Sequence, residues 1–200
     1  MTESHDRRIE KLLRNDRVIR VIGFDDAPFE RHGKIPVPVA GVVCATDRFE
    51  GMLWDHVEPD GFDANEVLAA RLESSKFHEQ LHAIFLDGVA VAGFNVVDVP
   101  ALSLRLDLPV ITVMRRRPDW TAIEAALQNV DNPEEKRSTM KRAGEIHQGD
   151  HIFFQSFALS SETARKLLSF TTREGHIPEP IRLAHLIARA VVTGESGRRA

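Results

Sequence analysis

A short stretch near the start of the chain decides the fold: VIRVIGF at residues 18–24, followed by DDAP at residues 25–28. Its β-branched residues predict a buried strand, and the Asp-Asp-Ala-Pro run predicts the turn that ends it. Two more strands are expected at 36–45 and 48–57, before a strong breaker, EPDG, at 58–61. Because these three strands are joined tightly, we expect an antiparallel meander.

Beyond residue 61 the apolar pattern changes to a helical period. Asp63 is expected to cap the first helix, and residues 82–86 form a buried strand that ends at Asp87-Gly88. The later elements are expected as helices at 95–106, 120–130, 133–143, 161–170 and 181–192, and as strands at 109–114 and 151–155. A meander that leads into parallel βα units predicts an α/β fold, with one mixed sheet and helices on both of its faces.

The size and composition of the chain are those of an ordinary globular protein. Its 200 residues suit one sizeable domain, since domains average roughly 150 residues. Apolar residues make up 42% and charged residues 28%, which excludes a disordered chain. We expect residues 18–200 to form a single domain, preceded by a charged tail or short helix at residues 1–17.

Several features bear on location and partners. No apolar stretch approaches the roughly 18 residues of a membrane span, and the charged N-terminus lacks the apolar core of a signal peptide. The single cysteine, Cys44, excludes an internal disulfide framework, so a reducing, cytoplasmic setting is expected. The formal net charge of −4 argues against nonspecific coating of nucleic acid, but it leaves room for local basic patches.

Acidic residues recur where predicted strands end. Asp25 and Asp26 follow the first strand, Glu58 and Asp60 the third, and Asp87 the fourth. Open α/β sheets bind their ligands at such ends, and carboxylates gathered from separate strands can share a divalent cation. The alternative is that each residue serves only as a turn former. The pattern leaves an acidic metal site and a set of turns both open.

Basic residues and one histidine are the other candidates. Arg115, Arg116 and Arg117 follow a central strand, where guanidinium groups would suit phosphate oxygens or would simply form a solvated charge run. His185 lies within the last amphipathic helix, where a structural role is the alternative. The histidine spacing argues against a zinc site, and no phosphate-binding glycine loop is present.

Three segments, in order, resemble endonuclease V, the repair nuclease that acts at deaminated bases. The IPEPIRLAHL segment at 177–186 resembles the PEPxRLAH segment of that family, GFD at 23–25 its first strand, and LDG at 86–88 its central strand. LPVITVMR at 108–115 resembles the family's LPxIGVAK, with Arg115 in place of the lysine. The closer resemblance, through GFDDAPF, LDGVAVAGFNVVD and IPEPIRLAHLIA, is to a largely archaeal branch named endonuclease dU.

The resemblance implies an RNase H-like fold, Mg²⁺ or Mn²⁺ as cofactor, and DNA repair by hydrolysis of a phosphodiester near a deaminated base, deoxyuridine or deoxyinosine. It implies that Asp25 and Asp87 are metal ligands and that His185 lies beside the attacking water or the phosphate. Asp60 is our choice for the third carboxylate, with Asp63 and Glu58 as alternatives. The residues expected to contact nucleic acid are Arg115, Arg116 and Arg182.

The chain also departs from endonuclease V. That family's Pro-Tyr-Ile-Pro wedge is replaced by GMLWDHV at 51–57, and the chain contains no tyrosine. Phe49, Met52 or Trp54 either stack on a base or pack within the sheet. Three other hypotheses stay open: an RNA-specific nuclease, a non-catalytic nucleic-acid-binding protein of the same fold, and an unrelated α/β domain whose carboxylates are turn residues.

Overall fold

The computed structural model describes residues 2–30 and 35–197. Its strands are β1 (Arg20–Asp26), β2 (Val37–Ala45), β3 (Arg48–Val57), β4 (Ala83–Asp87), β5 (Ala90–Val91), β6 (Asn95–Val96), β7 (Val110–Met114), β8 (His147–Gln148) and β9 (Phe153–Phe157). Its helices are α1 (Thr2–Arg14), α2 (Ala64–Glu73), α3 (Val99–Leu106), α4 (Trp120–Leu127), α5 (Pro133–Arg142), α6 (Ser161–Phe170) and α7 (Glu179–Thr193), with one 3₁₀ turn, η1 (His78–Gln80). None of these helices is long and apolar enough to cross a membrane.

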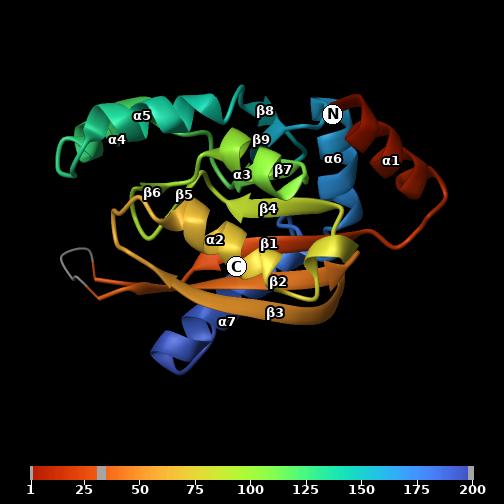
Figure 1. Cartoon of the computed structure of the whole chain (residues 1–200), viewed down its shortest axis with the longest axis horizontal. Coiled ribbons are helices and arrows are strands. Elements are labelled where there is room, and N and C mark those ends of the chain that lie inside the picture. The colour runs from red at the N-terminus through yellow and green to blue at the C-terminus, as the bar shows by residue number, and fades with distance from the viewer. Residues whose placement is uncertain (1, 31–34, 198–200) are drawn as a thin grey trace.

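Seven strands form one sheet in the order β3-β2-β1-β4-β7-β9-β8 (Figure 1). β1, β2 and β3 pair antiparallel, which confirms the predicted meander. β4 then lies parallel to β1, and β7 parallel to β4. At the far end of the sheet, β9 is antiparallel to β7 and β8 is antiparallel to β9. The predicted mixed sheet is therefore confirmed.

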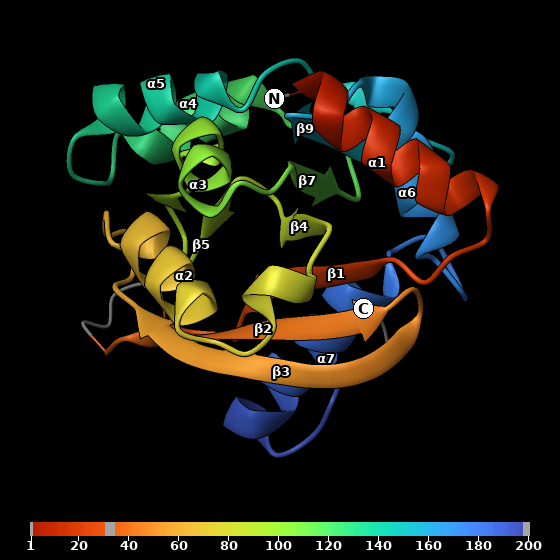
Figure 2. The ribbon, with the colours of Figure 1, turned by 45° about the vertical axis from the view of Figure 1, so that its right-hand side comes forward.

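Helices cover both faces of the sheet, as predicted (Figure 2). One face packs against α2 and α3 through the buried Leu68, Leu72, Leu102 and Leu106. The other face packs against α1, α6 and α7, where Ile9, Leu167 and Ile181 are buried in one cluster. The N-terminal segment is therefore a helix with a buried residue, and Asp6 anchors it further because its carboxylate accepts a hydrogen bond from the Ser160 amide.

Several predicted boundaries differ from the structure, among them that of β1, which runs two residues later than the expected 18–24. The helix expected from residue 95 begins only at Val99, after the Asp98 carboxylate caps it by accepting a hydrogen bond from the Ala101 amide. Asn95 instead lies in β6, in a hairpin with β5 that the pattern did not indicate. The last long strand is Phe153–Phe157, two residues later than expected.

Gly23 determines how closely α7 approaches the sheet. A Cβ atom at Gly23 would lie 2.6 Å from both the Ile181 backbone nitrogen and the Pro180 carbonyl carbon. These atoms belong to the first turn of α7, so that turn rests directly on the β1 backbone. Only glycine permits this approach, because backbone atoms cannot rotate away as a side chain can.

Gly23→Ala is expected to lower the free energy of unfolding by about 1–3 kcal/mol, the usual cost of overpacking. The new methyl group would push α7 away from β1, and thermal denaturation measures the loss. Gly51→Ala is the matched control, since its methyl group would meet only the ring of Phe77, which can move. Equal melting temperatures for the two variants would contradict the proposed role of Gly23.

Candidate functional site

Two carboxylates lie side by side where neighbouring parallel strands end. Phe24 of β1 is in register with Leu86 of β4, so the next residues, Asp25 and Asp87, are adjacent. With His185 of α7 they form a cluster in which one ligand atom from each side chain lies within 4.8 Å of the others. Three segments far apart in the sequence therefore meet at the edge of the sheet.

His185 is tied directly to Asp25. Its Nδ1 lies 2.8 Å from Oδ2 of Asp25, a contact that depends on the close seating of α7 over Gly23. The hydrogen bond to Asp25 raises the pKa of His185. Burial, with a further contribution from the charge of Asp87, raises the pKa of Asp25 to about 6, although the hydrogen bond from His185 opposes this shift.

The donor set fits a divalent cation. Mg²⁺ and Mn²⁺ both prefer oxygen ligands, which the carboxylates of Asp25 and Asp87 supply, with the imidazole of His185 beside them. The raised pKa of Asp25 reflects the cost of placing charge in a buried position beside Asp87. A cation bound between the two carboxylates would offset that cost. The residues present can therefore hold such an ion.

Arg115 lies on the rim of the cluster, as the sequence indicated. Its Nη1 donates to both oxygens of Asp87, at 2.8 and 3.1 Å. The guanidinium is partly exposed, whereas the side chain of Asp87 is only 14% exposed. A phosphate group that approached Asp87 would therefore meet the positive charge of Arg115 first.

Asp60 lies outside the cluster. Its Oδ1 accepts a 2.7 Å hydrogen bond from the Phe94 amide, so the carboxylate fixes the loop between β5 and β6. The two alternatives also lie outside the cluster: Asp63 accepts hydrogen bonds from the Glu58 amide and from Asn95 Nδ2. The structure thus brings together two of the expected carboxylates, not three.

Asp26, which the sequence pattern placed beside Asp25 without giving it a role, is not part of the cluster. Burial, followed by the charge of Asp25, raises its pKa to about 7, and a hydrogen bond from the Ala92 backbone opposes this. Because successive strand residues point to opposite faces, Asp26 and Asp25 point away from each other across the sheet. The Asp25-Asp26 pair was the only sign in the sequence that Asp26 could matter. Two adjacent aspartates do not show which one is a metal ligand and which one is a turn residue.

The remaining predicted nucleic-acid contacts differ in their surroundings. Arg116 is exposed in the loop after β7. Arg182 donates from Nε and Nη2 to Glu179, at 2.9 and 2.8 Å, and Glu179 is buried. Arg182 is thus held at the start of α7. Trp54 packs against α7, while Phe49 and Met52 are partly exposed on β3.

Lys136 of α5 joins two loops beside the site. Its Nζ donates to the carbonyl oxygens of Asp60, Gly61 and Phe94, at 2.7, 2.8 and 2.9 Å. The side chain is fully buried, and the Phe62 ring lies 3.7 Å from the ammonium group. The same pair of loops is joined again by Asn95, which donates to the Glu58 carbonyl. These bonds hold the loop between β5 and β6 in place, and the Ala92 backbone beside that loop donates a hydrogen bond to Asp26.

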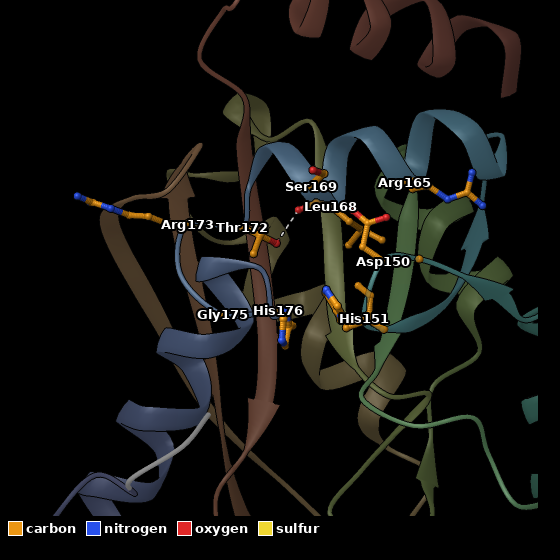
Figure 3. Close-up of a pocket in the computed structure, with 11 residues that line it drawn as sticks. Asp150, His151, Arg165, Leu168, Ser169, Thr172, Arg173, Gly175 and His176 are labelled. Atoms are coloured by element: carbon orange, nitrogen blue, oxygen red, sulfur yellow. Dashed lines mark hydrogen bonds between the residues drawn. The ribbon is translucent and has the colours of Figure 1, made fainter.

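A hollow of about 230 Å³ lies on another part of the surface, between residues 149–152 and the C-terminal part of α6. Figure 3 shows that Arg165 and Arg173 extend away from it in opposite directions. The rings of His151 and His176 lie against each other, with centroids 3.9 Å apart. No member of the acidic cluster lines this hollow, so it is separate from the candidate site.

Comparison with known proteins agrees with this fold. Residues 17–192 match the endonuclease dU family, in the range that contains Asp25, Asp87 and His185. The chain belongs to the endonuclease dU family. A UPF0215 protein of Archaeoglobus fulgidus is 37% identical over 181 residues, which is 90% of this chain and 98% of that protein.

Two solved structures are similar. The crystal structure of an Archaeoglobus fulgidus protein has a TM-score of 0.81 at 36% identity and covers 87% of this chain and 98% of its own. Endonuclease V of Ciona intestinalis, in complex with a DNA containing an inosine followed by a ribo-adenosine, has a TM-score of 0.61 at 16% identity. That match covers 94% of this chain and 96% of the other. The fold is RNase H-like, and family and fold together support a nuclease.

Proposed function

We propose that the chain is a metal-dependent endonuclease that hydrolyses a DNA phosphodiester near a deaminated base, deoxyuridine or deoxyinosine, in DNA repair in the cytoplasm. The observation that carries this proposal is the meeting of Asp25, Asp87 and His185 at one edge of the sheet. Membership of the endonuclease dU family supports it. The inosine-containing DNA bound by the Ciona endonuclease V supports the choice of nucleic acid and of base.

In this proposal Asp25 and Asp87 hold Mg²⁺ or Mn²⁺. When bound, a divalent cation supplies positive charge that acidifies an attacking water and offsets charge at the phosphate. Asp25 fixes the imidazole of His185 through Nδ1, so Nε2 is the nitrogen that remains to exchange a proton with water. Arg115 stabilises negative charge on the phosphate and, unlike a lysine, does not act as a proton donor.

A non-catalytic nucleic-acid-binding protein is the second candidate. The observation that favours it is that Asp60, the expected third carboxylate, holds the Phe94 amide and lies outside the cluster. Such a protein would bind oligonucleotides with an affinity that falls steeply with salt, and would leave them intact.

The test is cleavage of labelled single-stranded and duplex oligonucleotides that carry deoxyuridine, deoxyinosine or neither. Matched RNA strands decide between DNA and RNA, because the 2′-hydroxyl is the difference that a nuclease must recognise or tolerate. Each substrate is tested with Mg²⁺, with Mn²⁺ and with EDTA. Lesion-dependent cutting that EDTA abolishes is the expected result. Salt-sensitive binding without cutting under every condition would replace the proposal with the second candidate.

Arg115→Ala is expected to change metal binding and cleavage in opposite directions. Removing the guanidinium frees Asp87 from its ion pair, so the affinity for Mn²⁺ should rise several-fold. That gain corresponds to the free energy of one partly exposed ion pair. Cleavage should slow by roughly 10–100-fold, because the phosphate loses a charge-assisted contact. Calorimetry with Mn²⁺ and single-turnover cleavage measure the two effects. Weaker Mn²⁺ binding would show that Arg115 organises the site instead of competing with the cation.

A further inference from the structure

Two arginines flank His185 along α7, and only one of them is paired. Arg182, three residues before His185, is bound by the buried Glu179. Arg189, four residues after it, makes no hydrogen bond or ion pair with any residue in the described ranges 2–30 and 35–197. Its Nε atom is buried and has no partner there. Arg189 is only partly exposed, unlike the solvated arginines of the loop after β7.

Arg189 lies about one helical turn beyond His185 on α7. Four residues advance about 6 Å and slightly more than one turn along a helix, so Arg189 and His185 share one flank. Ala184 and Ala188 are buried against β2. The neighbouring flank of α7, with His185 and Arg189, therefore lies on the side of β1, where His185 contacts Asp25. Long helical side chains generally lean toward the helix N-terminus, which is the direction of His185 from Arg189.

A half-buried guanidinium without a partner is costly. A buried donor that lacks an acceptor is unfavourable, and the carboxylates of the cluster are already engaged: Asp25 by His185, and Asp87 by Arg115. An anion brought by a substrate would satisfy the Arg189 Nε. The planar guanidinium, with its fixed fork of donors, matches phosphate oxygens in particular.

We propose that Arg189 binds a phosphate of the nucleic-acid strand next to the one that is cleaved. This inference rests on the proposed function and adds a binding residue to its site. Arg189 is a binding residue and takes no part in the proton transfers of His185. Of these two arginines on α7, Arg182 pairs with Glu179 at the start of the helix, whereas Arg189 binds the nucleic-acid strand.

The test is binding of fluorescein-labelled single-stranded and duplex oligonucleotides in EDTA, measured by anisotropy over a range of salt concentrations. Arg189→Gln is expected to bind about tenfold more weakly near 0.1 M salt. The slope of log affinity against log salt should fall by about 0.7 for single strands and about 0.9 for duplexes, the loss of one phosphate contact. Arg189→Lys should keep the slope and lose part of the affinity, since it keeps the charge without the fork of donors.

Arg17→Gln is the matched control, because Arg17 is exposed just before β1, at the end opposite Asp25. Thermal denaturation of each variant establishes that it folds. Unchanged affinity and salt slope in Arg189→Gln would overturn the role of Arg189, even if the wild type cuts DNA. Binding that depends on Arg189 in a wild type that never cuts would support Arg189 and refute the nuclease. A wild type that binds no oligonucleotide would refute both.

Discussion

Asp87→Asn slows strand cleavage on the order of 10³-fold or more, because removal of one metal-binding carboxylate removes the charge that holds the cation. Asn has the shape of Asp and keeps one oxygen, so the fold remains. Without metal, the stability of the variant should stay within about 1 kcal/mol of the wild type, because the lost ion pair with Arg115 and the relieved repulsion of Asp25 act in opposite directions. Single-turnover cleavage with Mg²⁺ and thermal denaturation in EDTA measure the two effects.

The change in melting temperature on adding Mn²⁺ shows whether Asp87→Asn has lost metal binding or has lost activity for another reason. A ligand at 100 times its Kd stabilises the folded state by about 2.7 kcal/mol, so Mn²⁺ should raise the melting temperature of the wild type and not that of Asp87→Asn. Asp16→Asn, an exposed position before β1, serves as the control and should behave as the wild type. Equal stabilisation of Asp87→Asn by Mn²⁺ would place the metal elsewhere.

Lys136→Met lowers the free energy of unfolding by about 3 kcal/mol, because it leaves three half-buried carbonyl oxygens without their donor. For a chain of this size that is a fall of roughly 6–12 °C in melting temperature. Methionine has a similar length and fills the same space, so the effect reports the lost hydrogen bonds and not a cavity. Thermal and urea denaturation measure it.

Lys141→Met on the same helix is the control for Lys136. Lys141 is exposed, and surface substitutions of this kind usually change stability by less than about 0.5 kcal/mol. Similar melting curves for the two variants would mean that the carbonyl groups of Asp60, Gly61 and Phe94 find other donors. The loops would then hold together without the lysine.

The parts of the fold that depend on local pattern were predictable. The runs that form β1, β2 and β3 are separated by strong turn residues, and tight connections of that kind favour an antiparallel meander. The pattern placed Asp25 and Asp87 at the ends of apolar strands but left a shared site and separate turns both open, and they meet because β1 and β4 are parallel neighbours. Charges at the ends of adjacent parallel strands necessarily share one edge.

The parts that depend on distant contacts were not predictable. Lys136 belongs to a strongly charged helix and would be expected in solvent, yet it is buried against carbonyl groups that lie 42 to 76 positions away. Asn95 has the sequence context of a helix, and its side chain instead caps the start of α2 at Ala64. Asp60 is an acidic residue after a strand like Asp25, and only the fold shows that it holds a loop amide. Local preference cannot decide among such partners.

The bond between Asp25 and His185 joins positions 160 residues apart, the first strand of the sheet to the last helix. A ribosome adding about 5–20 residues per second needs roughly 8–30 s to make the chain between them. Throughout that interval the growing chain carries Asp25 and, later, Asp87 and the arginines after β7, but not its histidine. A chain that stalls before α7 therefore lacks the histidine that completes the cluster. Under the proposed function, the site would be completed only in the last part of synthesis, after Asp25 and Asp87 are already in place.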